Sequence, residues 1–177
     1  MRRIPYWLIV MIAVVLVAFG GRAISAQDKY SVQVPEGLSF AEFNGYEQWQ
    51  VIAVSQTGDL LVAILGNPEI IAAYQSGVPG NGKPFPDGSK MAKIHWNQKK
   101  SAEAPAPTLV PDTLHDIDFM VRDSKRFADN GNWAYAQFNY DAASETFTPL
   151  GTGVNCGTAC HTIVNAKDYV FTAYPKR

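Results

Sequence analysis

The sequence has little cysteine, little histidine and no excess of positive charge. It contains two cysteines and three histidines among 177 residues, and its 15 basic and 16 acidic residues nearly cancel. Proteins that bind nucleic acid or anionic lipid usually present a basic surface, so we expect neither as a partner. No internal repeat is evident along the chain. The composition therefore favours a single globular domain.

A long apolar run occurs at the N-terminus, but it is short for a membrane span. Arg2 and Arg3 precede an uncharged and mostly apolar stretch over residues 6–20, and small residues follow at positions 23–26. A full span needs about 20 apolar residues. This order of features is typical of a secretory signal peptide. It predicts a cleaved signal peptide over residues 1–26 and a periplasmic or secreted protein, with an uncleaved membrane anchor as the alternative.

The remaining residues, 27–177, are expected to form one domain. They number 151, which is enough for a hydrophobic core. The leader carries three arginines and no acid, so the mature chain keeps 12 basic and 16 acidic residues and a net charge of −4. A mildly acidic domain further disfavours nucleic acid as a partner.

The pattern of apolar residues predicts a sheet with few helices. Strands are expected over residues 49–54, 60–65, 90–96, 114–121 and 133–141, where apolar or aromatic residues cluster or alternate. A short helix is expected from the N-cap Asn67 to Gly77, with Pro68 at its first position. Residues 97–113 and 143–153 are expected to be loops. The fold class is therefore α+β, with a mainly antiparallel sheet and a few short helices.

Alternation along two of these strands assigns side chains to faces. Lys93 and His95 share one face of the strand over residues 90–96. In the strand over residues 114–121, Asp116 and Asp118 share a face, and His115 lies on the opposite, apolar one. His115 is therefore interpreted as a packed structural residue. His95 is interpreted as a surface or core-edge residue, with proton relay near Lys93 as the alternative.

Both cysteines lie in one short motif, Cys156-x-x-x-Cys160-His161, within "VNCGTACHTIV". The motif for covalent haem attachment is Cys-x-x-Cys-His, so this motif has one residue too many. Two thiols could form thioethers and the adjacent histidine could bind the iron. A disulfide closing a small loop is also compatible with the spacing, whereas zinc lacks a fourth ligand. From the residues alone, haem, disulfide and another metal stay open.

Several longer stretches resemble the cytochrome P-460 family, over about residues 31–177. The most specific are "DSKRFADNGNWAY" and the terminal "CHTIVNAKDYVFTAY", and the others are "LSFAEFNGYEQWQVIAV" and "ILGNPEIIAAYQSGVPGNGKPFPDGSKMAKIHW". The resemblance implies an exported c-type haem protein with a mainly β fold that forms a homodimer.

The resemblance also implies roles for four residues. His161 would be the proximal iron ligand, and Cys156 and Cys160 would form thioethers to haem c. The sixth iron position would be open. In the catalytic branch a lysine five residues after the glycine of a Phe-x-Asp-Gly element is bonded to the porphyrin. That element is residues 85–88 here, so Lys93 is the matching position; a lysine in water at a sheet edge is the alternative.

Two functions follow from the resemblance, and we favour the enzyme. It would be a haem-dependent oxidoreductase that oxidises hydroxylamine and passes electrons to a partner cytochrome. The alternative is a protein of the cytochrome c′-beta type, which binds nitric oxide or another gas without turnover. The catalytic branch also uses a carboxylate near the haem as proton acceptor, expected shortly before the first cysteine. Residues 148–155 contain no acid, and the nearest is Glu145, which weighs against the enzyme. A structural domain with one disulfide is a third hypothesis.

Overall fold

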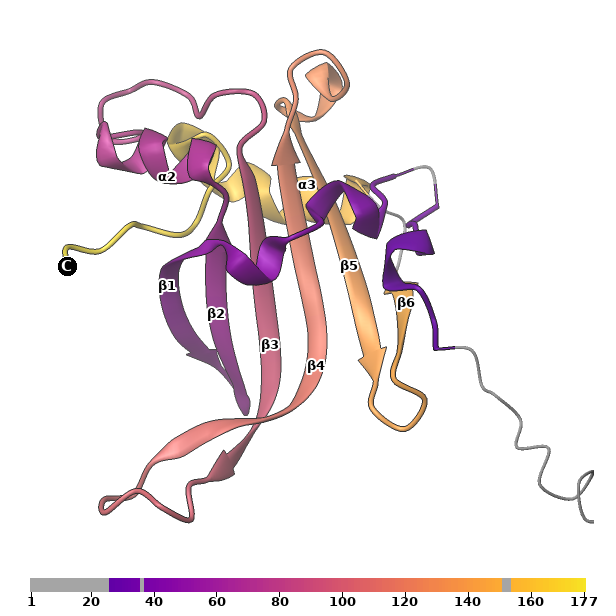
Figure 1. Ribbon diagram of the computed structural model, residues 1–177. Helices are drawn as coiled ribbons and strands as arrows, with labels where there is room; N and C mark the ends of the chain where they lie inside the picture. The colour runs from indigo at the N-terminus through magenta and orange to yellow at the C-terminus, as the bar shows by residue number, and fades with distance from the viewer. Residues whose placement is uncertain (1–25, 36, 151–153) are drawn as a thin grey trace, which may run out of the picture.

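The domain is built on one antiparallel sheet. The computed structural model describes residues 26–35, 37–150 and 154–177, with only the backbone for residues 154–156. Within this part of the chain, six strands pair in chain order from β1 to β6 (Figure 1). Each strand pairs with the next one along the chain, as hairpins do. The strands are β1 (Gln50–Thr57), β2 (Leu60–Gly66), β3 (Lys90–Lys100), β4 (Leu109–Arg122), β5 (Trp133–Asp141) and β6 (Thr146–Leu150).

Short helices join and flank the strands, so the predicted α+β class is confirmed. The α-helices are α2 (Pro68–Gln75) and α3 (Val154–His161). The expected cap of α2 is present, since the Asn67 side chain accepts a hydrogen bond from the backbone N–H of Ile70 at 3.3 Å. The 3-10 helices are η1 (Lys29–Ser31), η2 (Phe40–Phe43), η3 (Tyr46–Gln48), η4 (Ala128–Asn130) and η5 (Thr162–Lys167).

Two segments expected to be loops contain strands instead. β3 continues to Lys100 and β4 begins at Leu109, so the two strands form a long arm that extends beyond the rest of the sheet (Figure 1). Pro111 pairs with Gln98 in this arm. A proline fits there because β5 pairs with β4 only from Asp116 onward, which leaves the outer edge of the arm without ladder bonds. β6 likewise lies within the predicted loop over residues 143–153.

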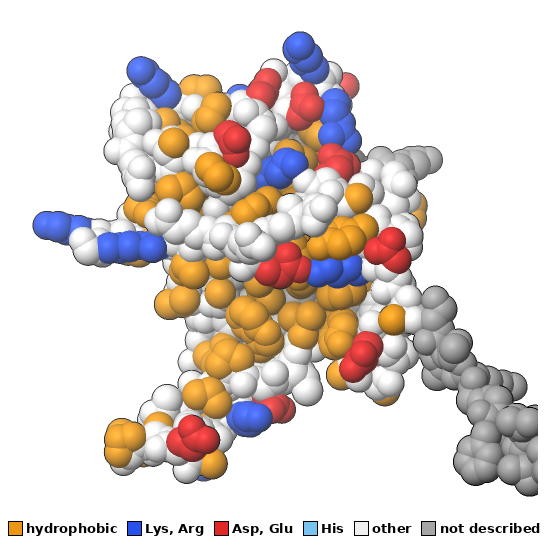
Figure 2. All heavy atoms as spheres, in the orientation of Figure 1, with side chains coloured by type: hydrophobic (Ala, Val, Ile, Leu, Met, Phe, Trp, Pro, Cys, Tyr) orange, Lys and Arg blue, Asp and Glu red, His pale blue; other side chains and the backbone are white. Residues whose placement is uncertain are grey.

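One face of the sheet packs against the N-terminal segment, which crosses in front of the strands in Figure 1. Phe40 and Phe43 of η2 are fully buried there, and Phe43 stacks on Phe119 of β4 with ring centroids 4.1 Å apart. Figure 2 shows this face: hydrophobic side chains gather over the strands below the N-terminal segment, and charged side chains lie mainly on the loops and the arm. We call it the front face.

The opposite face, the cavity face, packs against α2, α3 and the C-terminal segment. α3 lies behind β4 and β5 in Figure 1. Ile52, Ile70, Phe85 and Trp133 are buried in this second layer. The two faces therefore hold separate apolar clusters, and the second one surrounds the site described below.

None of the helices in the described residues is long and apolar enough to cross a membrane. Residues 1–25 of the predicted signal peptide lie outside the described residues, and the division at residue 26 stays a prediction.

Candidate functional site

A cavity of about 680 Å³ lies on the cavity face, between the sheet, α3 and the C-terminal segment. That volume is in the range of cofactor pockets. The lining is mostly apolar. Its charged or chemically active members are Lys93, Asp118, Cys160 and His161, and its apolar members include Ile64, Met91, Met120, Tyr135, Val170 and Phe171. Three of the four residues predicted to form the site therefore face one cavity, together with an acid that the sequence interpretation did not select.

His161 is held in one orientation at the end of α3. Its Nδ1 atom lies 2.6 Å from the backbone carbonyl oxygen of Tyr169, to which it donates a hydrogen bond. The ring also packs against Tyr135 and Phe171, with centroid distances of 4.5 and 5.0 Å. Donation from Nδ1 leaves Nε2 as a free lone pair. Histidines that bind metals in proteins are usually fixed in this way.

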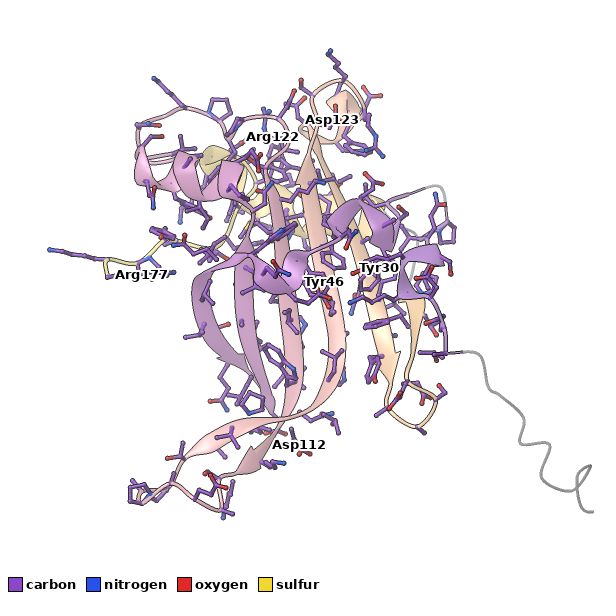
Figure 3. All side chains as sticks on the ribbon, viewed as in Figure 1. Tyr30, Tyr46, Asp112, Arg122, Asp123 and Arg177 are labelled. Atoms are coloured by element: carbon purple, nitrogen blue, oxygen red, sulfur yellow. The ribbon has the colours of Figure 1, made fainter. Side chains whose placement is uncertain are left out.

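A tight turn after η5 brings that carbonyl to the histidine. Asp168 and Tyr169 both have left-handed backbone, with φ of 51° and 63°, a conformation that residues other than glycine rarely adopt. The Asp168 carboxylate accepts a hydrogen bond from the backbone N–H of Phe85 at 2.8 Å and lies 3.3 Å from the Nε atom of Arg122. Figure 3 shows Arg122 at the end of β4, beside these loops. These contacts stabilise the turn.

The environment favours the neutral form of the His161 ring. Burial lowers its pKa below the ordinary value, and the nearby positive charge of Lys93 acts in the same direction. The hydrogen bond to Tyr169 raises the pKa but does not reverse the shift. A neutral imidazole is the form that binds a metal ion.

The cysteine motif lies on α3. Cys160 is a free, exposed cysteine that lines the cavity, and position 156 is one helical turn earlier on the same backbone. The side chain of Cys156 lies outside the described residues. Gly157 between them allows α3 to approach β5 closely, because a Cβ atom there would lie 2.2 Å from Cγ of Tyr135.

Lys93 points into the cavity from a central strand, so the sheet-edge alternative is wrong. β3 pairs with β2 on one side and β4 on the other. The loop before it is anchored by Asp87, which accepts hydrogen bonds from Arg122 at 2.6 Å and from the Ser124 backbone at 3.0 Å. Gly88 then turns with φ of +86°. The Phe85–Gly88 element thus fixes the start of β3 and the direction of Lys93.

Asp118 is the site residue that the sequence interpretation missed. It pairs with Lys93 across β3 and β4, and its Oδ2 atom lies 4.0 Å from the Lys93 Nζ atom. Its Oδ1 atom is buried with no hydrogen-bond partner among the described residues. Burial raises the pKa of Asp118, and the neighbouring Asp116 carboxylate adds to the rise, although His95 and Lys93 oppose it. Only the register of β3 against β4 would have identified Asp118, and the sequence does not specify that register.

The two remaining histidines lie just beyond Asp118. His95 is buried, and its Nδ1 atom is 2.5 Å from Asp116 Oδ1. His115 contacts the other oxygen of the same carboxylate. The interpretation of His115 as a packed apolar-face residue was wrong, because its side chain is 48% exposed and shares the side of Asp116.

The comparison with protein families decides the identity of the cofactor. A family model for cytochrome P460 matches residues 43–172. The chain belongs to the cytochrome P460 family. Proteins of this family are c-type haem proteins that contain iron. Comparison with curated proteins finds no match.

The described residues fit a haem. The cavity is large and mostly apolar, it contains a thiol and an imidazole with a free Nε2 atom, and it leaves one buried carboxylate oxygen without a partner. His161 would hold the iron, and Cys160 would supply a thioether. The second thioether from Cys156, the Lys93 bond to the porphyrin, the homodimer and the partner cytochrome stay predictions.

Proposed function

We propose that this cytochrome P460 family protein oxidises hydroxylamine. The observation that supports the proposal most is the Asp118 carboxylate inside the cavity, beside Lys93. The sequence interpretation counted the lack of an acid in residues 148–155 against the enzyme. A carboxylate from β4 removes that objection, because it offers a proton acceptor from a different part of the chain.

The chemistry of hydroxylamine requires such an acceptor. Its oxidation to nitric oxide breaks two N–H bonds and one O–H bond, and releases three protons with three electrons. The haem, when bound, supplies one-electron redox chemistry and an open coordination position. The electrons leave to a one-electron acceptor, which we propose to be another cytochrome. The protons need a base within the cavity.

Asp118 has the properties of that base. Its raised pKa makes the carboxylate a better proton acceptor than an ordinary aspartate. The buried Oδ1 atom has no hydrogen-bond partner among the described residues, so it is available to an N–H or O–H donor. Lys93 lies opposite, 4.0 Å from Oδ2. A lysine that is bonded to the porphyrin would keep the ring next to this carboxylate.

The other residues of the cavity hold and shield the reacting group. His161 would bind the iron through Nε2, fixed by its bond to Tyr169. Cys156 and Cys160 would attach the haem covalently, although the three residues between them exceed the usual two. Met91, Met120 and Ile64 line the cavity with apolar surface, which limits the access of water and strengthens charge effects inside.

Capture of nitric oxide or another small gas is the second candidate function. The largely apolar lining supports it, because a neutral diatomic ligand needs no charged partner. Under this hypothesis Asp118 would matter little, since binding of a neutral gas moves no proton. The two functions therefore differ in how strongly they depend on one carboxylate.

Steady-state oxidation of hydroxylamine by the purified holoprotein, with a dye as electron acceptor, tests the proposal. We expect turnover by the wild type, and Asp118→Asn should lower kcat by about 10²-fold or more. Asp112→Asn is the matched control, because Asp112 lies on the β3–β4 arm, paired with Lys99 at 2.8 Å (Figure 3). Nitric oxide binding without turnover, unchanged in Asp118→Asn, would support the second function instead.

We also propose export, because covalent haem attachment to thiols suits an exported chain whose leader is residues 1–26. N-terminal sequencing of the mature protein tests this: a start at Gln27 supports cleavage, and a start at Met1 in a membrane fraction supports the anchor.

A further inference from the structure

A row of acid and imidazole groups continues from the cavity along the sheet. Lys93 and Asp118 face each other across β3 and β4, and His95 and Asp116 form the next pair on the same side. One side-chain ligand atom from each of His95, Asp116 and Asp118 lies within 4.8 Å of the others. A single water molecule can bridge such a distance with two hydrogen bonds. Asp118 lines the cavity, whereas the other two lie beyond it.

The buried pair has the geometry of an oriented base. His95 and Asp116 are 6% and 4% exposed, and the Nδ1 atom of His95 is 2.5 Å from Asp116 Oδ1. A carboxylate at Nδ1 fixes the tautomer with a free Nε2 and stabilises the ring when it becomes charged. Burial alone would raise the pKa of Asp116, but hydrogen bonds to His95 and His115 lower it below its ordinary value. The ionised form of Asp116 is therefore favoured at rest.

A β-bulge extends this pair to the surface. His95 pairs with Asp116 but the next residue, Trp96, pairs with Leu114, so β4 contains one extra residue, His115. Bulges of this kind redirect a side chain. His115 therefore contacts the second oxygen of Asp116 instead of pointing to the front face, and 48% of its side chain is exposed.

We propose that His95, oriented by Asp116, takes protons from Asp118 and passes them to solvent through His115. In the first step the O–H bond of protonated Asp118 breaks, and an N–H bond forms on the free ring nitrogen of His95 through one bridging water. The Nδ1–H bond of the imidazolium then breaks as its proton passes to the Asp116 carboxylate. The short-lived carboxylic acid gives a proton to the Nδ1 lone pair of a His115 ring that carries its own proton on Nε2, and His115 releases that Nε2 proton to water. No electron moves in these steps, and Asp118 returns to the carboxylate form.

The surroundings leave few competing groups. The charged neighbours of Asp118 are Lys93 and His95 from β3 and Asp116 from its own strand. β5 places Gln137 opposite Asp118, and the amide side chain of Gln137 does not titrate. The relay rests on the proposed role of Asp118 as proton acceptor, so the test must separate the two.

The acceptor role of Asp118 and the relay can be separated by measuring proton release when the haem is oxidised by a reagent that itself transfers no proton. The reduced holoprotein is mixed rapidly with ferricyanide in weak buffer that contains a pH indicator, and haem absorbance and indicator colour are followed together. Oxidation adds positive charge to the cavity and favours loss of the Asp118 proton. We expect wild-type proton release to follow haem oxidation closely, and Asp118→Asn to lose the proton signal.

His95→Gln and Asp116→Asn should keep the size of the signal but slow it by about tenfold or more relative to haem oxidation. Asp112→Asn is the control and should behave as wild type. His115→Gln is included as a variant that should keep the fold, because the exposed His115 ring is not part of the core. It should release protons more slowly, and added imidazole should restore the rate, an effect that a structural role would not produce.

Two results would overturn parts of the scheme separately. A full signal in Asp118→Asn, or none in the wild type between about pH 4 and pH 8, would remove Asp118 as the acceptor and the relay with it. A signal lost in Asp118→Asn but released at the wild-type rate in His95→Gln and His115→Gln would keep the acceptor and reject the relay.

Discussion

The Nδ1 atom of His161 donates a hydrogen bond to the backbone carbonyl oxygen of Tyr169 at 2.6 Å. The donor ends α3 and the acceptor lies in the left-handed turn after η5. This bond joins the two halves of the terminal "CHTIVNAKDYVFTAY" stretch, so one segment supplies both the ring that we propose as the iron ligand and the group that orients it. The turn is therefore part of the proposed haem site, although none of its side chains is a proposed iron ligand.

Removal of the His161 ring should remove normal iron ligation. In His161→Ala, we expect the absorption spectrum of the holoprotein to change in both the ferric and reduced states, because the free Nε2 atom is lost. Added imidazole should restore part of the original spectrum by entering the vacated space. His115→Gln is the control, since its ring contacts Asp116. An unaltered spectrum in His161→Ala would contradict the assignment.

Lys93 should be bonded to the porphyrin, and peptide mapping can show it directly. Trypsin cannot cut after a modified lysine, so the digest should contain residues 91–99 joined to residues 127–167 with the mass of one haem. The reduced Soret band should be strongly red-shifted, and Lys93→Arg should show an ordinary band with haem still attached through cysteine.

Separate peptides from these two regions, with cleavage after Lys93, would show that the lysine is free. In that case its place 4.0 Å from Asp118 would make it an ion-pair partner. The same digest reports whether Cys156 and Cys160 both carry thioethers, because a single attachment leaves one thiol open to alkylation.

Sequence patterns predicted the long periodic elements well and the site only in part. The β2 strand, the cap of α2 and the alternation of β3 follow from local residue preferences, which act within one element. β6 was missed because Thr146–Leu150 contains a proline and follows a turn, features of loops. It becomes a strand by pairing with β5, and pairing between strands is not encoded locally.

The same distinction explains Asp118 and His115. Alternation correctly placed Asp116 and Asp118 on one side of a strand, but it could not show that Lys93 lies opposite Asp118. His115 was assigned to the wrong side because one bulged residue breaks the two-residue period. His161 was already a candidate from the cysteine motif, whereas Lys93 was selected through the resemblance to a family. The turn at Asp168 was not predictable because neither of its residues is glycine.

Close packing of α3 on β5 should depend on the missing side chain of Gly157. A Cβ atom at this position would lie 2.2 Å from Cγ of Tyr135, so Gly157→Ala must displace the helix or the ring. We expect a loss of about 1–3 kcal/mol in unfolding free energy, as for other overpacked sites, and less haem incorporation. Gly80→Ala is the matched control, because its added Cβ would meet only one backbone oxygen at 3.4 Å. Equal denaturation midpoints for the two variants would contradict close packing at α3.

Asp118 should reduce stability at neutral pH while it supports activity. Burial raises its pKa above the ordinary 3.8, so the folded state binds the proton more tightly than the unfolded state. Its contribution to stability is therefore greatest at low pH, and is lost as the pH rises through the folded-state value. Asp118→Asn, which cannot ionise, should be more stable than wild type at pH 7 and should lose less stability between about pH 4 and pH 7.

Asp141→Asn is the opposite control for this effect. Backbone hydrogen bonds from Ser144 and Ala143 lower the pKa of Asp141, so that carboxylate stabilises the fold above its ordinary pKa and the contribution is lost as the pH falls. Guanidinium denaturation at several pH values should thus shift the two variants in opposite directions at pH 7. A decrease in stability in Asp118→Asn would mean that its attraction to Lys93 outweighs the cost of burial. An increase together with slower hydroxylamine turnover would mean that the carboxylate is kept for its chemistry, at the expense of the fold.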